Sequence, residues 1–521
     1  MEPSASVLHD NRLKNDINGL RASIATSSYK PRLLVVLIAD SEGSEMLSND
    51  RVANIRRGTN LDPRSLFLVS HGLSIPEVSN FVGTVLAALQ PSCMEYYRDL
   101  SKHARRKRNR GSIPSPTAPP LVGTSRVLTA QEWNVRYETK LGYFAEFAQE
   151  MDAAGRNYEA AYELLVDGEI FDGIASWSPR FDEARMLADV LATRILRCLL
   201  WTGQTTSVAQ SWANHRWRML DLVESKGKGS TMYGWQAWEA RWSSIMAELI
   251  ERIDVPIFQV PSHLQPDTTG LEVIDIYAIP EKAFLQEERL PPWDLLHHEG
   301  YWYRRSAQRT MMRRKLAMLM PKEDRVEPGQ SPASTIASRT HLYDTYLCPE
   351  PHHEFALEGK ETFDHSALLI ETIGKAALHF SQRRQKRAVE RAGLDIAQEY
   401  IRSGRWQQAW ILLGPLWRNL SWRISGWWML VEEVSWAVRA CARNLDDGET
   451  LIAVEWELMS DLLTPRADWQ YNLSKCLNDL DVEDRPHAII DASSLSPVSK
   501  SINSVSIKTN KFQCLHLLHL G

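Results

Sequence analysis

The sequence predicts a mainly α-helical protein, an α-solenoid of stacked helical hairpins that follows a small α/β unit. Two segments, 140–165 and 396–416, predict the hairpins, because each carries small and apolar residues at helical spacing around a glycine. Two short apolar runs near the start, 33–39 and 65–69, predict strands. A chain of 521 residues is too long for one hydrophobic core, so we expect several domains or a solenoid that grows by stacking.

The two hairpin segments share one sequence register at a constant offset. On this grid Ala148, Met151, Gly155, Ala160 and Leu164 match Ala397, Tyr400, Gly404, Ala409 and Leu413. We expect Ala160 and Ala409 to lie where two helix backbones approach closely, and the glycines to lie between the helices. The pattern resembles the tetratricopeptide (TPR) unit, two helices joined by a tight turn. The alternative is two ordinary amphipathic hairpins of similar composition, since no strict period joins the copies.

The first part of the chain is expected to hold an arm, an α/β unit and a linker. Residues 1–30 predict a flexible arm, because they combine mixed charge with no sustained apolar run. Residues 31–110 predict the α/β unit, in which one helix begins at the Ser74–Glu77 capping box and another begins at Ser92. Residues 111–123 are rich in Pro and Ser and predict a linker.

The rest of the chain predicts two helical blocks. The first block of helical hairpins spans 124–320 and contains an irregular, proline-interrupted stretch at 256–296. A second linker at 321–340 precedes the second block of hairpins, 341–480. Residues 481–521 lack clear periodicity and predict a disordered or atypical tail.

Composition favours a reduced protein without a nucleic-acid function. The net charge of -5 and pI of about 6.3 give no general affinity for a polyanion. The six cysteines form no CxxC pair, which predicts free thiols rather than a disulfide scaffold or a zinc ribbon. The apolar run at 33–39 is seven residues long, whereas a membrane-spanning helix needs about 20. We therefore expect a cytoplasmic protein.

Familiar catalytic and cofactor motifs are absent from the sequence. It contains no GxSxG, no GxxxxGK[ST], no HExxH and no GxGxxG after a strand, so we expect no enzyme activity, no metal and no cofactor. A weak alternative is a hydrolase that uses Ser70 and His71. A second weak alternative is a metal site drawn from His341, Asp344, Cys348, His352, His353 and His365, whose spacings match no standard site.

Three basic clusters lie at 102–110, 304–315 and 383–391. Such clusters bind anionic lipid headgroups at about 1 kcal/mol per charge near the surface, or acidic partners, and both contacts weaken with salt. The candidate partner or lipid contacts are Arg105, Arg106, Lys107, Arg108, Arg305, Arg309 and Arg313. The alternative is a set of solvated helix faces. Nucleic acid is not an expected partner, because no groove-reading module accompanies the clusters.

Seven tryptophans crowd residues 406–436. We expect them to pack between hairpins, because each buried indole removes a large apolar area from water. The alternative is a partner-binding patch, since Trp is enriched among interface anchors.

The block Lys140–Phe147 (KLGYFAEF) and the run from Tyr158 to Leu165 resemble the foie gras domain family of trafficking protein particle (TRAPP) complex subunit 11. The Trp-rich helix from Gly234, the block His298–Tyr303 and the hairpin around Gly404 follow in the family's order. The resemblance covers 31–480, with the foie gras domain at about 124–480. Members of the family are longer and end in β-rich domains that this chain lacks.

The resemblance implies a non-catalytic scaffold subunit of a vesicle-tethering complex in ER-to-Golgi transport and autophagy. Its partners would be other tether subunits and, indirectly, a Rab-type GTPase, on which other small subunits act. Contact with anionic membrane would be peripheral, at Golgi and ER–Golgi intermediate membranes. The alternative function is a TPR-like adaptor that captures acidic peptide tails of partner proteins.

Overall fold

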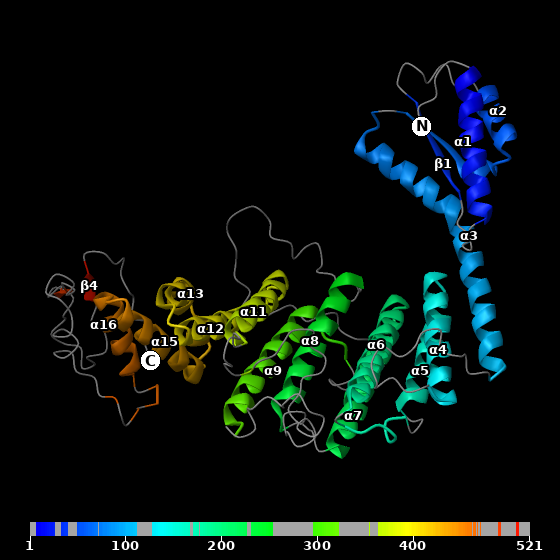
Figure 1. Cartoon of the computed structure of the whole chain (residues 1–521). Coiled ribbons are helices and arrows are strands. Elements are labelled where there is room, and N and C mark those ends of the chain that lie inside the picture. The colour runs from blue at the N-terminus through cyan, green and yellow to red at the C-terminus, as the bar shows by residue number, and fades with distance from the viewer. Residues whose placement is uncertain are drawn as a thin grey trace, which may run out of the picture. The chain divides into compact units, whose positions relative to one another are not determined.

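The computed structural model is dominated by helices, and few strands accompany them (Figure 1). The structure describes residues 7–26, 33–39, 49–70, 72–111, 128–166, 170–176, 178–226, 231–253, 295–321, 354, 363–460, 462–464, 466, 469, 488–490 and 507–509. The chain divides into two compact units, residues 1–168 and 169–521, and each is described by itself. The predicted fold class, mainly α-helical hairpins with a small α/β unit, is confirmed.

Unit 1 begins with the small α/β arrangement. Its elements are α1 (Val7–Thr26), β1 (Val35–Ala39), α2 (Asn49–Thr59), the 3-10 turn η1 (Pro63–Ser65), β2 (Leu66–Ser70) and α3 (Ile75–Asn109). β1 and β2 pair in parallel with Val35 opposite Leu66, and the segment between them supplies the crossover that parallel strands require. Leu37 of β1 is buried in a core with Ile17 of α1 and Ile55 of α2.

Residues 7–26 form helix α1, so the expectation of a flexible arm over 1–30 was wrong for this stretch. Leu13 and Ile17, four residues apart, lie on one face of α1 and are buried in the core of the α/β unit. Asp10 also accepts a hydrogen bond from Nε of Arg51 on α2 at 2.7 Å. Tertiary contacts therefore order this segment, and the narrow apolar stripe among mixed charges gave little sign of it in the sequence.

A single helix, α3, replaces the two helices expected at 74 and 92. The predicted capping box is present, because the Ser74 N–H donates to a carboxylate oxygen of Glu77 at 2.8 Å. Ser92 lies inside α3 and begins no helix. Pro91 removes one backbone donor from the interior of α3, and Figure 1 shows the helix changing direction part-way along its length.

Unit 1 ends with the predicted hairpin of α4 (Ala130–Phe147) and α5 (Met151–Val166). These two helices pack on each other, and α4 also packs on α3. The first helical block expected at 124–320 is therefore divided, since α4 and α5 belong to unit 1 and the later helices belong to unit 2.

Unit 2 contains helices that pack largely in chain order. They are α6 (Pro179–Trp201), α7 (Thr205–Ser225), α8 (Tyr233–Ile253), α9 (Glu299–Leu319), α11 (His365–Gln382), α12 (Lys386–Arg402), α13 (Trp406–Arg418), α14 (Ser421–Ile424), α15 (Trp428–Asn444) and α16 (Gly448–Leu458). From α8 onwards α9, α11, α12, α13, α15 and α16 each pack on the helix before them in this series. Sequential packing of neighbours is the arrangement that helical repeats adopt.

The same three-residue turn joins helices in both units. Its middle residue has a left-handed backbone, at Gln149, Gly203, Arg384, Gly404, Gly426 and Asp446. The next residue donates its backbone N–H to the carbonyl five positions earlier, as from Glu150 to Ala145 at 2.9 Å and from Arg405 to Tyr400 at 2.8 Å. This is the Schellman ending, which satisfies the last carbonyls of one helix and turns the chain directly into the next.

The turn corrects the register that the sequence grid assumed. Gln149 and Gly404 hold the equivalent left-handed positions, an offset of 255 residues, whereas matching Ala148 with Ala397 assumed 249. Gly155 lies inside α5 rather than between the two helices. In the first hairpin the left-handed position is occupied by Gln149 and not by a glycine. Aligning the two hairpins on Gly155 and Gly404 therefore gave the wrong register.

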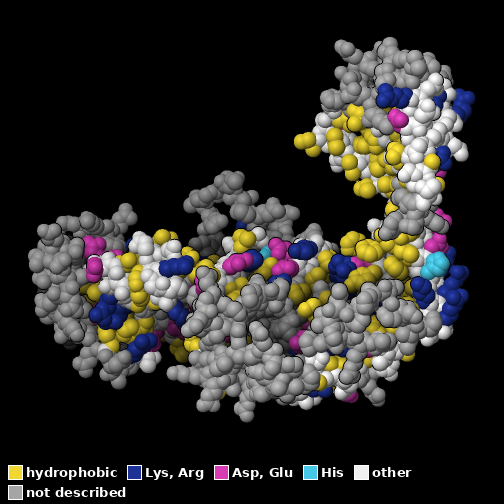
Figure 2. All heavy atoms as spheres, in the orientation of Figure 1, with side chains coloured by type: hydrophobic (Ala, Val, Ile, Leu, Met, Phe, Trp, Pro, Cys, Tyr) yellow, Lys and Arg dark blue, Asp and Glu magenta, His cyan; other side chains and the backbone are white. Residues whose placement is uncertain are grey.

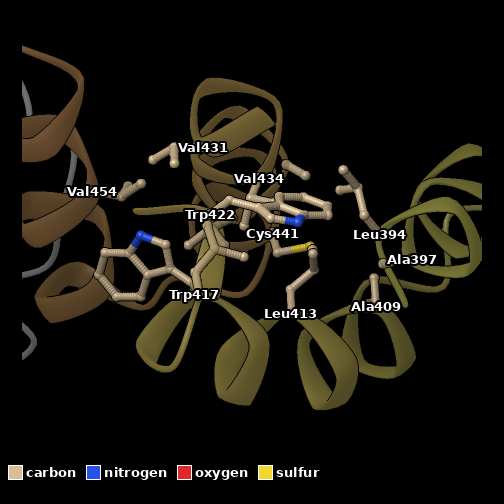
Figure 3. Close-up of a cluster of buried hydrophobic side chains, with 13 residues drawn as sticks. Leu394, Ala397, Ala409, Leu413, Trp417, Trp422, Val431, Val434, Cys441 and Val454 are labelled. Atoms are coloured by element: carbon tan, nitrogen blue, oxygen red, sulfur yellow. The ribbon is translucent and has the colours of Figure 1, made fainter. Parts of the chain in front are cut away.

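A large apolar core lies in unit 2 among α12, α13, α14, α15 and α16. Figure 3 shows Ala397 and Ala409 side by side, with Leu413 and Trp422 farther into the cluster. All four side chains are buried, which agrees with the expectation of a close helix contact at Ala409. Ala160, which was expected to play the same part in the first hairpin, is exposed on α5, and the neighbouring Ala161 is fully buried instead.

Several expected segments lie largely outside the described residues. These are the linkers at 111–123 and 321–340 and the irregular stretch at 256–296. Within the expected tail, 481–521, the short strands β3 (Ala488–Ile490) and β4 (Ile507–Thr509) pair antiparallel. The tail was expected to be disordered or atypical, and within it these two strands are ordered.

Replacing Ala409 with Trp should destabilise unit 2, and the same change at Ala160 should not. The larger side chain at Ala409 has no room between α12 and α13, so we expect a loss of about 1 to 3 kcal/mol. At the exposed Ala160 the expected change is within about 0.5 kcal/mol. Thermal melting followed by circular dichroism compares the two variants. Equal melting temperatures would contradict the burial assigned to these positions.

Candidate interaction surfaces

The C-terminal half of α3 is fixed against α4 by aromatic and ionic contacts. The Tyr97 ring stacks on Phe144 at a centroid distance of 6.5 Å and lies 5.2 Å from Phe147. Arg108 forms an ion pair with Glu138 near the other end of this contact. Because the α3–α4 contact is held at both of its ends, the cationic side chains on the outer side of α3 and α4 keep the same positions relative to one another.

Six cations gather on this part of unit 1, and we call them the basic face. They are Arg105, Arg106 and Lys107 of α3, Arg110 at the C-cap of α3, and Arg136 and Lys140 of α4. The α3 members are exposed, and Figure 2 shows Lys and Arg side chains gathered along the C-terminal part of α3. In the described part of unit 1 none of the six forms an ion pair, so their positive charge is not neutralised locally.

The lowered pKa of Lys140 reflects the short distances between the positive charges of α3 and α4. Partial burial lowers the pKa of the Lys140 ammonium, and the positive charges of Arg136 and Lys107 lower it further. The Arg136 guanidinium lies 4.9 Å from the centroid of the Trp133 ring, which holds it beside the face. A site of this kind attracts a polyanionic surface or segment, with an affinity that falls as salt rises.

Arg105, Arg106 and Lys107 were candidate contacts from the sequence, whereas Arg136 and Lys140 were not among the candidates. Those two come from a separate helix, and their spacing of four residues was the available signal. Arg108 was also a candidate contact, and its ion pair with Glu138 gives it a structural part in joining α3 to α4.

The second basic cluster is partly turned inward, and the burial of Arg313 contradicts the contact expected there. Arg309 pairs with Glu239 of α8 at 2.9 Å, and burial lowers its pKa despite that carboxylate. Arg313 is only 3% exposed and pairs with Glu354, while its guanidinium lies 4.2 Å from the Phe363 ring centroid. Arg305 lies over Trp302 of its own helix at 5.5 Å.

Most cations of the third basic cluster, though not the exposed Arg384, make internal contacts. Arg383 pairs with Glu299 at 3.2 Å, and Arg391 pairs with Glu433 at 2.7 Å. Arg387 lies 4.4 Å from the Trp427 ring centroid. Among the crowded tryptophans Trp417 and Trp422 are buried in the unit 2 core, as the packing hypothesis expects.

The remaining sequence candidates fall partly outside the described residues. His71, the Ser70 side chain and the metal candidates His341, Asp344, Cys348, His352 and His353 lie there. His365 is described, and it contacts Glu354 at 2.9 Å. Among the described residues no group of three or more possible ligands is placed to hold a metal ion. None of the helices in the described ranges combines the length and apolar character needed to cross a bilayer.

Two family models match the chain. The model described as "Foie gras liver health family 1" matches residues 180–461, more than half of the sequence. The chain belongs to the foie gras family. A second model, described as the trafficking protein particle complex subunit 11 N-terminal domain, matches residues 1–78.

Curated relatives carry the same description. The chain is 20% identical over 457 residues to trafficking protein particle complex subunit 11 of Gallus gallus, covering 84% of this chain and 34% of the relative. The corresponding proteins of Bos taurus and Homo sapiens are each 19% identical, covering 85% of this chain and 35% of the relative. The chain thus spans about a third of the length of the relatives it matches.

The foie gras match coincides with the helices of unit 2. The matched segment begins beside Ser178, the N-cap of α6, and ends just after α16. It is therefore shorter than the foie gras domain expected at about 124–480. The KLGYFAEF block of α4, which carried the resemblance most strongly, lies between the two matched segments. Packing on α5 accounts for its Gly142 and Tyr143, and packing on α3 accounts for its Phe144 and Phe147.

Gly142 is the point of closest approach in the α4–α5 hairpin. A Cβ atom at this position would lie 2.4 Å from the Tyr158 ring, so a side chain does not fit. Tyr158 is fully buried, and its hydroxyl donates to a carboxylate oxygen of Glu146 at 2.6 Å. Gly142 therefore admits the ring, and Glu146 satisfies its polar end, which ties α4 to α5.

Replacing Gly142 with Ala should destabilise the α4–α5 hairpin. Alanine favours helix by about 0.5 to 1 kcal/mol, but the clash with the Tyr158 ring should cost about 1 to 3 kcal/mol and dominate. The matched control is Gly19→Ala in α1, where nothing lies within 4 Å of the added Cβ, and there the helix preference should stabilise. Limited proteolysis at the α4–α5 turn measures both. Equal protection in the two variants would contradict the close approach.

Neutralising the basic face should weaken binding to an anionic surface. The double variant Lys107→Gln, Arg136→Gln removes two charges at about 1 kcal/mol each, so binding to phosphatidylserine vesicles should fall roughly 30-fold. The control, Arg57→Gln with Arg64→Gln, removes two exposed charges elsewhere in unit 1. Vesicle sedimentation at several salt concentrations measures the difference. Equal losses in both variants would mean that only net charge matters.

Proposed function

We propose that this chain is a subunit of a TRAPP-type vesicle-tethering complex and acts as a non-catalytic scaffold through protein–protein contacts. The process is ER-to-Golgi transport and autophagy, on the cytoplasmic side of Golgi and ER–Golgi intermediate membranes. Its direct partners are other subunits of the tether. A Rab-type GTPase is reached indirectly, through the small subunits of the complex.

One observation carries this proposal. The chain matches the subunit 11 N-terminal domain at 1–78 and the foie gras family at 180–461, and the relatives that cover 84% to 85% of the chain are named as trafficking protein particle complex subunit 11. An unrelated helical scaffold would be expected to share the hairpins but not this pair of matched segments in one chain.

The arrangement of the helices supports action through contacts. Hairpins that pack in sequence use one face of each helix internally and leave the outer faces for other proteins. Several charged side chains of α9 and α12 form structural ion pairs, such as Arg314 with Glu399 at 2.7 Å. That use accords with a structural rather than a chemical part for these buried groups.

The basic face favours a second candidate function, an adaptor that captures acidic peptide tails. Its unneutralised cations on α3 and α4 suit a segment rich in Asp and Glu. The two functions differ in what the chain should carry when it is isolated. A tether subunit should bring several small subunits in fixed ratio, whereas an adaptor should bring acidic peptides and no fixed assembly.

Quantitative co-purification tests the proposal. The tagged chain, expressed in cells of its own organism, should recover TRAPP subunits in stoichiometric amounts. Ala409→Trp should reduce that recovery by disturbing the unit 2 core, and Ala160→Trp should leave it unchanged. Recovery of acidic peptides without TRAPP subunits would favour the adaptor, and recovery of neither would refute both functions.

A further inference from the structure

The N-terminal half of α3 carries an apolar stripe, exposed except at the half-buried Leu89, which we call the α3 seam. It consists of Ile75, Val78, Val82, Leu86 and Leu89, spaced by three or four residues and therefore aligned along one side of the helix. Ile75 is 89% exposed and Leu86 is 61% exposed, and Val78 and Val82 are also exposed. Figure 2 shows hydrophobic side chains gathered on this part of unit 1. A contiguous apolar surface of this kind marks an interaction site.

The seam is separate from the contacts that α3 makes inside unit 1. Phe81 meets Phe67 of β2 at a centroid distance of 6.0 Å, and it lies about 100° around the helix from Val82. Tyr97 meets α4, and Gln90 donates to Gln149 of the α4–α5 turn at 3.3 Å. The Phe81 contact therefore uses another side of the helix, and the Gln90 and Tyr97 contacts lie beyond the C-terminal end of the seam, so Ile75, Val78, Val82 and Leu86 stay exposed.

The surroundings of the seam specify an uncharged partner. Residues 78–94 contain no Asp, Glu, Lys or Arg. Ser79 and Gly83 flank the large side chains, and nothing lies within 4 Å of a Cβ placed on Gly83, so a second helix can approach closely. A charged partner would lose its hydration here without gaining an ion pair. The fitting partner is a helix with an apolar, uncharged line of its own.

The spacing of the seam is the same in both directions, namely three, four, four and three residues. When the helix is reversed about Val82, Val78 falls opposite Leu86 and Ile75 falls opposite Leu89. An antiparallel pair of identical seams therefore brings apolar side chains together at every position, with no like charges opposed. We propose that the α3 seam pairs with the α3 seam of a second copy of this chain, antiparallel about a two-fold axis at Val82. This dimer goes beyond the proposed tethering function and does not depend on it.

Disulfide trapping tests the axis and the direction. In a Cys93→Ser background, which removes the exposed native thiol of α3, Val82→Cys should form a covalent dimer under mild oxidation. Thr84→Cys is the matched control, exposed on the opposite side of α3, and should not. A mixture of Val78→Cys and Leu86→Cys chains should cross-link to each other, and neither should cross-link alone. Ready self-cross-linking of Val78→Cys, or equal cross-linking of Thr84→Cys, would overturn the antiparallel pair.

Analytical ultracentrifugation of the purified chain tests the dimer itself. The chain should sediment as a dimer, and Leu86→Asp should raise the dissociation constant at least tenfold. Leu378→Asp is the matched control, since Leu378 of α11 is 58% exposed, close to the 61% of Leu86, and it should leave the dimer intact. A monomer at all concentrations, or equal effects of the two variants, would overturn the proposal. A seam that cross-links to a different protein or needs lipid vesicles would do so as well.

These results are independent of the proposed function. The dimer is measured on the purified chain alone, without any TRAPP subunit. Co-purification of Leu86→Asp with TRAPP subunits is measured separately, and it tests the tethering function while the dimer is absent.

Discussion

The left-handed residue that closes each three-residue turn is the constraint on which the helical architecture depends. At Gln149, Gly404 and their equivalents the backbone reverses within three residues, and the N–H of the next residue satisfies a carbonyl of the helix that has just ended. A turn this short leaves the following helix no option except to pack beside the preceding one. The helices that this turn joins are therefore neighbours because of local backbone geometry, and their apolar faces are brought together without a long loop closure.

The sequence was sufficient to predict helices and hairpins but not their register. Periodic apolar residues mark a helical face whatever its partner, so the stripes around Ala397 and Ala409 were found correctly. The ends of the helices depend on single backbone angles, which Gly404 signals and Gln149 does not. Ala160 and Ala161 differ by one position along the chain and by about 100° around the helix, so a small error in register exchanged an exposed side chain for a buried one.

Charge clusters were predicted less well, because a run of Arg in the sequence does not say where its counterions are. Arg309 and Arg313 recur at helical spacing as a surface stripe would, yet their carboxylate partners Glu239 and Glu354 come from other segments of the chain. Those partners become visible only in the folded structure. By contrast, Arg105 and Lys107 lie on the outer side of α3, with no described carboxylate to meet them. Whether a cation is held in a structural ion pair or is available for binding therefore depends on the tertiary structure.

Apolar stripes alone do not determine which helix packs on which, since α9, α11 and α12 present similar Ala, Leu and Ile side chains to one another. The buried pair of Arg314 on α9 and Glu399 on α12 adds that selectivity, with two bonds of 2.7 Å and Ser366 of α11 donating to the same carboxylate. Burial raises the pKa of Glu399, but the hydrogen bonds and charge of Arg314 outweigh it, so the pKa lies below its ordinary value. A slip of one helical turn would bury one of these charges without its partner, at a cost of about 3 to 5 kcal/mol. The polar pair therefore fixes the relative positions of three helices that apolar contacts hold together.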